Sequence, residues 1–259
     1  HVEAGLRTGN LLSPFPEEAN RQLTGVLSNV NFAPTETARG NLLRESKDDK
    51  NIYVVGNTVI DALLATVKKD YHFEDAELEA IEEHKRVILV TTHRRENLGA
   101  PMHHVYRALR RLVEAVPDTE VVFPVHRNPL VREAVSEELE GVPGIHLVEP
   151  MEYEPFTNLM ARSAIVLTDS GGIQEEAPSL GKPVLILRDT TERPEAVEAG
   201  TVKLVGTDEE KIFHAAYELL TDEKAYKAMA EAVNPYGDGH SAERIADALL
   251  YIEGLSDKK

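Results

Sequence analysis

Six short apolar runs alternate with helical or turn segments between residues 87 and 205, and this alternation constrains the fold more than any other feature. The six runs are 87–90, 121–123, 145–148, 164–167, 184–187 and 202–205. Short apolar runs separated by helical patterns are typical of buried parallel strands joined by helices. We therefore predict an α/β fold with a doubly wound parallel sheet, in which ligands lie at the carboxyl ends of the strands.

The first 65 residues have a different organisation. Strand-like runs occur only at 30–33 and 52–55, and helices are expected to begin at Pro16 and at Thr35 and to cover 58–69. Because two strands make no complete sheet, we expect this segment to be the second half of an α/β domain whose first strands lie upstream.

We expect three parts in the chain. Residues 1–65 form the end of a first Rossmann-like domain, and residues 66–235 form a second domain that begins with an acidic helix at 75–83. Residues 236–259 form a linker and a helix at 241–255, which we expect to pack back on the first domain.

Composition excludes several classes of function. The formal net charge of −17 repels polyanions, so neither a nucleic acid nor an anionic membrane is an expected partner. The chain has no cysteine, and no apolar run approaches the length of a membrane span. These features predict a cytoplasmic protein without disulfides.

The stretch 168–176, with sequence TDSGGIQEE, follows the fourth run of the regular region. A helix that begins directly after Ser170, Gly171 and Gly172 presents backbone N–H groups to an anion, and glycine lets a diphosphate approach closely. Glu176, one turn later, could accept hydrogen bonds from a ribose diol. The alternative is a tight turn whose Gln-Glu-Glu face is solvated.

Further polar residues follow other runs. His93, Arg94 and Arg95 come after the first run, where a histidine could stabilise a departing diphosphate, and His126 comes after the second. The alternative for His93 is a helix cap whose neighbouring arginines pair with surface acids. Arg193, after the fifth run, is either a ligand contact or a salt-bridge partner in its Glu-rich loop.

Four more candidates depend on geometry that the sequence does not give. Glu3 and Glu17 could act as base and acid on opposite faces of one carbon, although most of the 45 acidic residues are expected to be surface charge or helix caps. Arg7 lies close to Glu3 in sequence. Phe156 could lie against a flat base, or it could belong to the core.

Several motifs are absent. No Gly-x-Gly-x-x-Gly follows a strand, and there is no Walker loop, HExxH motif, cysteine cluster or serine hydrolase elbow. We therefore expect neither a cofactor nor a metal.

Seven stretches together resemble the non-hydrolysing UDP-N-acetylglucosamine 2-epimerases. They are HVEAGLRTG, SPFPEEANR, VGNTVIDAL, THRREN, PVHRNP, TDSGGIQEEAPSLGKPVLILRDTTERPEA and NPYGDG, and they occur in this order over essentially the whole chain. The resemblance implies the glycosyltransferase-B architecture, with UDP between two Rossmann-like domains. It also implies that about the first third of a family member is missing, including an early arginine and an active-site aspartate.

The resemblance implies a role for each candidate. Ser170, Gly171 and Gly172 would hold the diphosphate, Glu176 the ribose, and Phe156 the region of the uracil. His93 would contact the phosphate nearest the sugar, Glu3 and Glu17 would be the active-site carboxylates, and Arg7 and Arg193 would contact sugar or phosphate. Glu18, Arg94 and His126 would contribute to a regulatory site for a second UDP-GlcNAc.

The implied reaction is reversible conversion of UDP-GlcNAc to UDP-ManNAc through 2-acetamidoglucal by a homodimeric enzyme that feeds cell-surface polysaccharide synthesis. Three alternatives stay open at this point. They are a hydrolysing epimerase, a glycosyltransferase of the same fold, and an inactive fragment that binds UDP-sugars.

Overall fold

The computed structural model describes all residues except 13–14, 83, 95–96, 192 and 258–259. The chain divides into two compact units. Unit 1 consists of His1–Ala65 with Asn234–Lys259, and unit 2 consists of Thr66–Val233. The C-terminal segment thus belongs to the same unit as the N-terminus.

Unit 2 contains a six-stranded, all-parallel sheet in the order β5-β4-β3-β6-β7-β8. Its strands are β3 (Arg86–Thr91), β4 (Thr119–Pro124), β5 (Ile145–Val148), β6 (Ile165–Thr168), β7 (Val184–Ile186) and β8 (Val202–Leu204). All six predicted runs are strands, displaced by two residues at most. The α/β prediction is therefore confirmed, and the sheet order reverses between β3 and β6.

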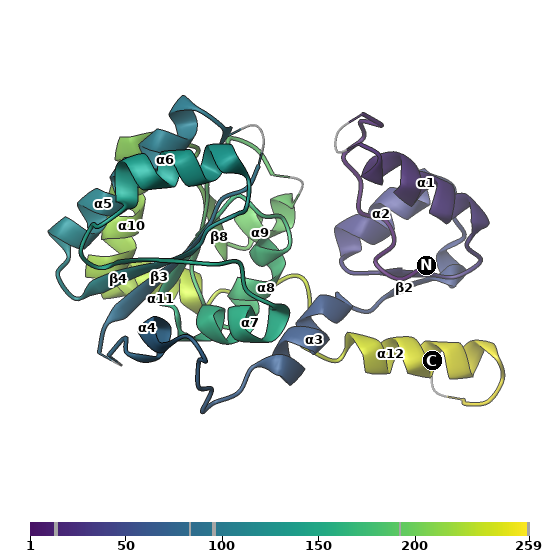
Figure 1. Ribbon diagram of the computed structural model, residues 1–259. Helices are drawn as coiled ribbons and strands as arrows, with labels where there is room; N and C mark the ends of the chain where they lie inside the picture. Colours follow the sequence, from purple (N-terminus) through teal and green to yellow (C-terminus); the bar gives the residue numbers. More distant parts are fainter. Residues whose placement is uncertain (13–14, 83, 95–96, 192, 258–259) are drawn as a thin grey trace. The chain divides into compact units, whose positions relative to one another are not determined.

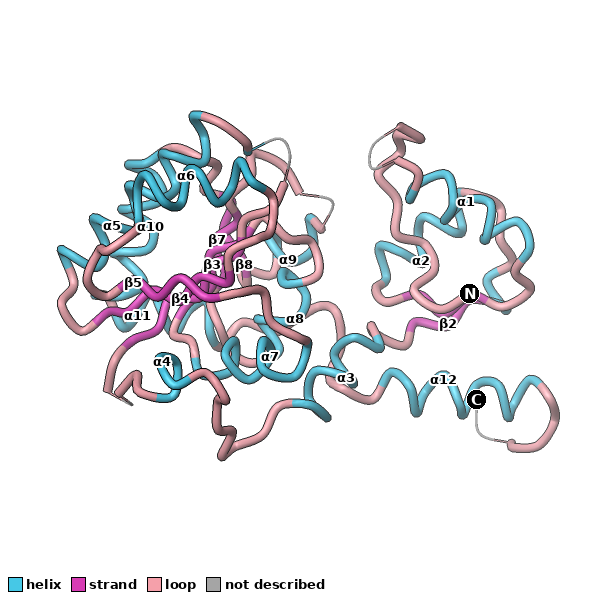
Figure 2. Tube along the Cα trace, in the orientation of Figure 1, coloured by secondary structure: helices cyan, strands magenta, loops and turns pink. Residues whose placement is uncertain are grey.

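Helices cover both faces of this sheet (Figure 1). They are α4 (Ala76–Glu79), α5 (Ala100–Ala115), α6 (Pro129–Leu139), α7 (Tyr153–Arg162), α8 (Ile173–Ser179), α9 (Pro194–Glu198), α10 (Glu209–Thr221) and α11 (Glu223–Ala230). The strands appear as the magenta centre of this unit in Figure 2. The predicted acidic helix at 75–83 is shorter than expected: α4 begins after its Asp75 cap and ends at Glu79.

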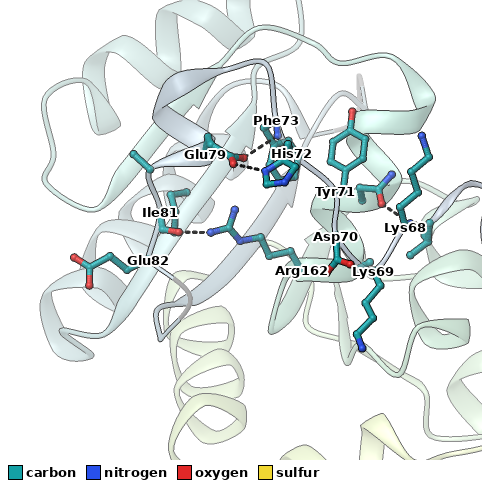
Figure 3. A pocket seen from close by; sticks show the side chains of 14 residues that line it. Lys68, Lys69, Asp70, Tyr71, His72, Phe73, Glu79, Ile81, Glu82 and Arg162 are labelled. Atoms are coloured by element: carbon teal, nitrogen blue, oxygen red, sulfur yellow. Dashed lines mark hydrogen bonds and ion pairs between the residues drawn. The ribbon is translucent and has the colours of Figure 1, made fainter.

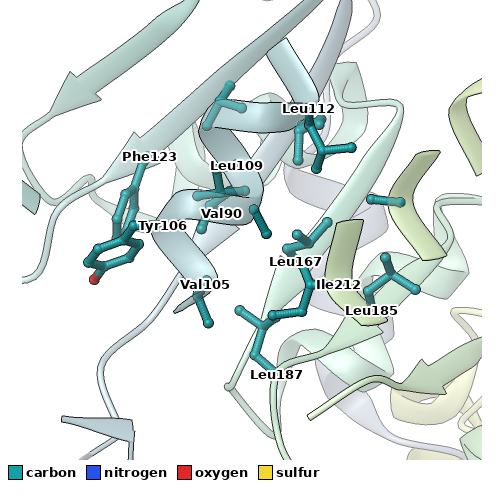
Figure 4. Packing of buried hydrophobic residues seen from close by; sticks show 14 of the residues in the cluster. Val90, Val105, Tyr106, Leu109, Leu112, Phe123, Leu167, Leu185, Leu187 and Ile212 are labelled. Carbon is teal, nitrogen blue, oxygen red and sulfur yellow. The ribbon is translucent and has the colours of Figure 1, made fainter. Parts of the chain in front are cut away.

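One continuous apolar cluster holds α5, α6 and α10 on the sheet (Figure 4). Alternate strand residues such as Val90 and Leu167 point into it and are fully buried. Their neighbours Leu89 and Val166 are equally buried and point to the opposite face. Because both faces are covered, these strands read as continuous apolar runs rather than as alternating patterns.

Unit 1 is built around a parallel pair of strands, β1 (Asn31–Ala33) and β2 (Ile52–Val54). An isolated parallel bridge joins Val2 to Phe32 on the other side of β1. The remaining elements are α1 (Glu17–Leu27), α2 (Glu36–Arg44), the 3-10 turn η1 (Asp49–Asn51), α3 (Thr58–Thr66) and α12 (Ser241–Ile252). The predicted helix 58–69 ends three residues early, and 241–255 ends at Ile252.

Two small cores stabilise unit 1. Ala4, Ala33, Ala38, Leu42 and Ile52 pack on one side of the strands. On the other side Phe32 and Val55 pack with Ala248 of α12, so the C-terminal helix supplies part of this core.

Side chains close the N-termini of several helices, including α2 and α12. Thr35 accepts a hydrogen bond from the Ala38 N–H, as its predicted capping role requires. The last helix is capped from a distance, because the Asp61 carboxylate accepts the N–H groups of Ser241 and Ala242 at 3.1 and 2.7 Å.

Candidate functional site

The reversal of strand order places the carboxyl ends of β3 and β6 side by side, where the loops leave on opposite faces of the sheet. Crevices of this kind bind ligands in doubly wound folds. The side chains of Thr91 and Thr168, at the ends of these two strands, are joined by a 2.6 Å hydrogen bond. His93 follows β3, and Ser170, Gly171 and Gly172 follow β6.

Asp169 organises the loop that follows β3. Its carboxylate is completely buried and accepts the backbone N–H groups of His93 and Arg94 at 3.0 Å each and the amide of Asn97 at 3.2 Å. The His93 ring nitrogen Nδ1 lies 3.0 Å from the same carboxylate. Sequence analysis did not single out Asp169, although its place between a buried strand and the glycine turn was a usable signal.

The protonation of Asp169 reflects these contacts. Burial alone would raise the pKa of its carboxyl, but the His93 ring and the backbone N–H groups of Arg94 and His93 hold the pKa below its ordinary value of 3.8. The carboxylate is therefore charged at neutral pH and fixes the orientation of His93, whose side chain is 42% exposed and available to a ligand.

The His93 ring stacks on the His126 ring, with centroids 6.0 Å apart. Arg94, another of the proposed regulatory residues, donates from Nε to the Asp169 carbonyl oxygen. The structure therefore brings His93, Arg94 and His126 together at one edge of the sheet. Arg95 lies outside the described residues.

The stretch after the glycine turn is not solvated. Gln174, Glu175 and Glu176 at the start of α8 are all buried, so the alternative of a solvated Gln-Glu-Glu face is wrong. Gln174 donates to the Ser170 carbonyl oxygen at 3.2 Å and accepts from the Thr191 hydroxyl at 2.6 Å. The turn is thus connected to the loop that follows β7.

Arg193, in that loop, pairs with Glu175 of α8. The structure thus contains a salt bridge of Arg193, as the alternative expected, and this partner lies on α8. The Arg193 guanidinium compensates the charge of the Glu175 carboxylate, which is almost fully buried.

Glu176 is paired with a residue that sequence analysis did not select. The Tyr153 hydroxyl donates to the Glu176 carboxylate at 3.0 Å. Burial raises the pKa of Glu176, and burial together with the neighbouring Glu176 charge raises the pKa of Tyr153 to about 12. Phe156 lies one turn further along α7 and is half-buried, so it is not a full member of the core.

The candidate residues of unit 1 form a separate group. The Glu3 carboxylate contacts Arg21 at 3.4 Å and Asn57 at 3.2 Å, and sequence analysis identified neither partner. Arg7, the sequence neighbour of Glu3, instead makes a two-point ion pair with Glu45 at 2.6 and 2.9 Å.

The two adjacent glutamates at the start of α1 have different environments. Glu17 is exposed, and it lies four residues before Arg21 and therefore on the same helix face. Glu18 is buried and accepts the N–H groups of Thr8 and Gly9 and the amide of Gln22. Burial by itself would raise the pKa of Glu18, but the hydrogen bonds from Thr8, Gln22 and Gly9 lower the pKa below its ordinary value.

A cavity of about 810 Å³ lies elsewhere in unit 2 (Figure 3). Residues 67–73, 79–82, Asn158, Ala161 and Arg162 line it. The segments ending at Glu82 and Arg162 precede β3 and β6, so this cavity lies at the amino ends of the strands. It contains no predicted site residue, and Arg162 there is bound to the carbonyl oxygens of Leu78 and Ile81.

No helix in the described part of the chain is long and apolar enough to cross a membrane. No group of three or more histidine, aspartate or glutamate side chains among the described residues could hold a metal ion.

The chain is similar to known proteins over nearly its whole length. The family model for UDP-N-acetylglucosamine 2-epimerase matches residues 1–250. The UDP-N-acetylglucosamine 2-epimerase of Bacillus subtilis strain 168 is 56% identical over 254 residues, which are 98% of this chain and 66% of that protein. The enzyme of Escherichia coli K12 is 55% identical over 96% of this chain and 68% of its own length.

Solved structures are similar over the same extent. The UDP complex of Staphylococcus aureus MnaA has a TM-score of 0.93 and 49% identity, covering all of this chain and 70% of that one. The Neisseria meningitidis UDP-GlcNAc 2-epimerase bound to UDP-GlcNAc has a TM-score of 0.86 and 49% identity, covering 97% of this chain and 69% of that one.

The chain thus spans about two thirds of the length of the relatives that it matches. Within that span, the family match extends over both units and includes every candidate residue discussed above. The chain therefore belongs to the UDP-N-acetylglucosamine 2-epimerase family.

Proposed function

We propose that this protein interconverts UDP-GlcNAc and UDP-ManNAc at C2 of the sugar and supplies UDP-ManNAc for cell-surface polysaccharides. The observation that carries the proposal is the grouping of His93, Ser170, Gly172 and Glu176 around the reversal of strand order in unit 2. A site with helix N–H donors and an adjacent histidine suits a diphosphate, and proteins of this family have been solved with UDP and with UDP-GlcNAc.

The proposed chemistry is an elimination followed by an addition. A carboxylate removes the C2 proton, the bond between C1 and the diphosphate oxygen breaks, and UDP leaves with the electron pair. The resulting 2-acetamidoglucal then takes UDP back at C1 and a proton on the opposite face of C2. The reaction consumes no oxidant or reductant, because every bond that breaks is formed again.

Each group has a role in this scheme. Glu3 and Glu17 carry out the two proton transfers, and His93 stabilises the charge that develops on the departing diphosphate. Ser170, Gly171 and Gly172 bind the diphosphate, Glu176 binds the ribose and Phe156 lies near the uracil. Arg7 and Arg193 contact the sugar or a phosphate in this scheme, although in the structure their guanidinium groups pair with Glu45 and Glu175.

Two finer parts of the proposal concern assembly and regulation. We propose that the working enzyme is a homodimer. The regulatory residues are Glu18, Arg94 and His126; support comes from the contacts of Arg94 and of the His126 ring with the Asp169–His93 loop.

Proton NMR in deuterated water tests the reaction. UDP-GlcNAc incubated with the protein should acquire deuterium at C2 while UDP-ManNAc appears. Glu3→Gln and Glu17→Gln should abolish this exchange and leave UDP affinity unchanged, whereas Glu176→Ala should mainly weaken UDP binding. Release of free ManNAc and UDP would instead indicate a hydrolysing enzyme, and UDP binding without any exchange would mean that this chain alone does not catalyse the reaction.

A further inference from the structure

Glu3 has an unusual backbone conformation. Its φ is +62°, in the left-handed region that residues with a side chain rarely adopt. Among the described residues, the only other non-glycine with positive φ is Ser46. Ser46 closes the end of α2 and donates to the Leu43 carbonyl oxygen, a common place for a left-handed residue. Glu3 ends no helix, so its conformation needs another cause.

Arg21 supplies part of that cause. Its guanidinium donates from Nη1 to the Glu3 carbonyl oxygen at 3.1 Å and from Nη2 to the Glu3 carboxylate at 3.4 Å. A planar guanidinium that contacts the main chain and the side chain of one residue restricts the backbone and the side-chain torsions together. Arg21 also lies one turn after Glu17 on α1, on the face that carries this second carboxylate.

Asn57 fixes the other oxygen of the Glu3 carboxylate. Its side-chain amide donates to Glu3 Oε1 at 3.2 Å, while its own Oδ1 accepts the Val59 N–H at 3.1 Å at the start of α3. The Asn57 backbone N–H donates to the Tyr236 carbonyl oxygen at 2.7 Å. Asn57 is buried, and its two side-chain contacts orient the amide while the backbone contact holds its main chain.

The main chain around Glu3 is also held. The Ala4 N–H donates to the Phe32 carbonyl oxygen at 2.9 Å, and the Ala4 side chain is fully buried. Strained residues persist only where their surroundings determine them, and they occur preferentially at functional sites. The contacts around Glu3 therefore restrict its carboxylate far more than an ordinary surface glutamate.

We propose that Arg21 and Asn57 are positioning residues that hold the Glu3 carboxylate in the single orientation needed for proton transfer at C2 of the sugar. This inference rests on the proposed function. It assigns neither residue to contact with the nucleotide, so their loss should slow proton transfer and leave UDP binding intact.

Three variants test the proposal. Arg21→Ala removes both contacts, and Arg21→Lys keeps the charge without the planar fork. Asn57→Asp keeps the oxygen that caps α3 and replaces the donor to Glu3 by a repelling oxygen. Arg39→Ala is the matched control, because it removes an arginine that pairs with Glu36 and Asp49 at the exposed surface of the same unit.

Arg21→Ala and Asn57→Asp should lower the rate of C2 deuterium exchange about 100-fold, the loss expected for a misplaced catalytic group. Their UDP Kd should match that of Arg39→Ala. Because the buried charge of Asn57→Asp lowers its thermal unfolding midpoint, binding and exchange are measured below the midpoint of each variant. Added guanidinium should restore part of the exchange in Arg21→Ala and none in Asn57→Asp. Exchange at the wild-type rate in both variants would overturn the proposal.

Crystal structures of the same variants decide the question independently of turnover. In Arg21→Ala the φ of Glu3 should leave the left-handed region, and in Asn57→Asp the carboxylate should turn away from residue 57. An unchanged Glu3 in both variants would refute the positioning role. Wild-type protein without any C2 exchange would instead count against the proposed function, whatever Glu3 does.

Discussion

Asp169 is the residue on which the geometry around His93 depends. One buried carboxylate accepts two backbone N–H groups and an amide and also contacts the His93 ring. A carboxylate can satisfy so many donors because it has only acceptor sites. An amide at the same position would direct its own N–H groups at some of these donors.

We expect Asp169→Asn to lower the free energy of unfolding by about 3 kcal/mol at neutral pH, because buried N–H donors that now meet the carboxylate would lose their acceptor. The pKa of Asp169 is lowered by folding, so its contribution is complete above the ordinary value of 3.8 and is lost as the pH falls through the folded value. The stability difference between variant and wild type should therefore shrink below pH 3.8.

Urea unfolding followed by circular dichroism at a series of pH values measures this difference. Asp238→Asn is the control, because Asp238 pairs with Arg244 at the surface, where ion pairs contribute little. An equal loss for both variants, or a difference that does not change with pH, would show that Asp169 is not the organising charge.

At the scale of elements, the start of α8 combines buried side chains at Gln174, Glu175 and Glu176 with an exposed glycine, Gly172, at its N-cap. A Cβ at Gly172 would meet nothing closer than the Glu176 carboxylate at 4.0 Å, and the φ of Gly172 is −61°. The fold itself therefore accepts a side chain at this position. Under the proposed function, a glycine here lets the diphosphate approach the backbone.

We expect Gly172→Ala to leave the thermal unfolding midpoint unchanged or slightly raised and to weaken UDP binding at least about tenfold through lost backbone hydrogen bonds. Isothermal titration calorimetry with UDP measures the affinity. Gly40→Ala, within α2, is the control, since its Cβ would also meet nothing closer than 3.7 Å. Unchanged UDP affinity in Gly172→Ala would place the diphosphate elsewhere.

At the scale of the whole molecule, the two units have separate cores. Unit 1 depends on the return of the C-terminal segment, which meets the first part of the chain at Gly56. The φ of Gly56 is +90°, and a Cβ there would lie 2.6 Å from Ser241 Oγ and 3.3 Å from the Tyr236 carbonyl oxygen. Only glycine fits this backbone conformation and this close approach.

Gly56→Ala should therefore destabilise unit 1 by about 3 kcal/mol, from backbone strain together with overlap. Hydrogen exchange measured by mass spectrometry should show faster exchange in β2 and α12 and unchanged exchange in the sheet of unit 2. Gly254→Ala has a similar φ of +69° but open space around it, so it reports the strain alone. Equal protection loss in both units would mean that they unfold together.

The sequence by itself determined the secondary structure and the fold class. The strands of unit 2 are buried on both faces, so they stand out as apolar runs, and local hydrogen bonds such as the Thr35 cap can be read from neighbouring residues. Motif order identified the family. The exact ends of helices could not be predicted as well from the sequence. Apolar residues continue past the last residue of α3, and acidic residues continue past the last residue of α4.

Only the tertiary structure decided which side chains meet. Arg7 is four residues from Glu3, yet Arg21 contacts Glu3, because α1 turns one helix face toward the residue-3 loop. Asn57 is 54 residues from Glu3, and Asp169 is 76 residues from His93. Such contacts depend on how strands and helices pack, and sequence spacing carries no direct record of that packing.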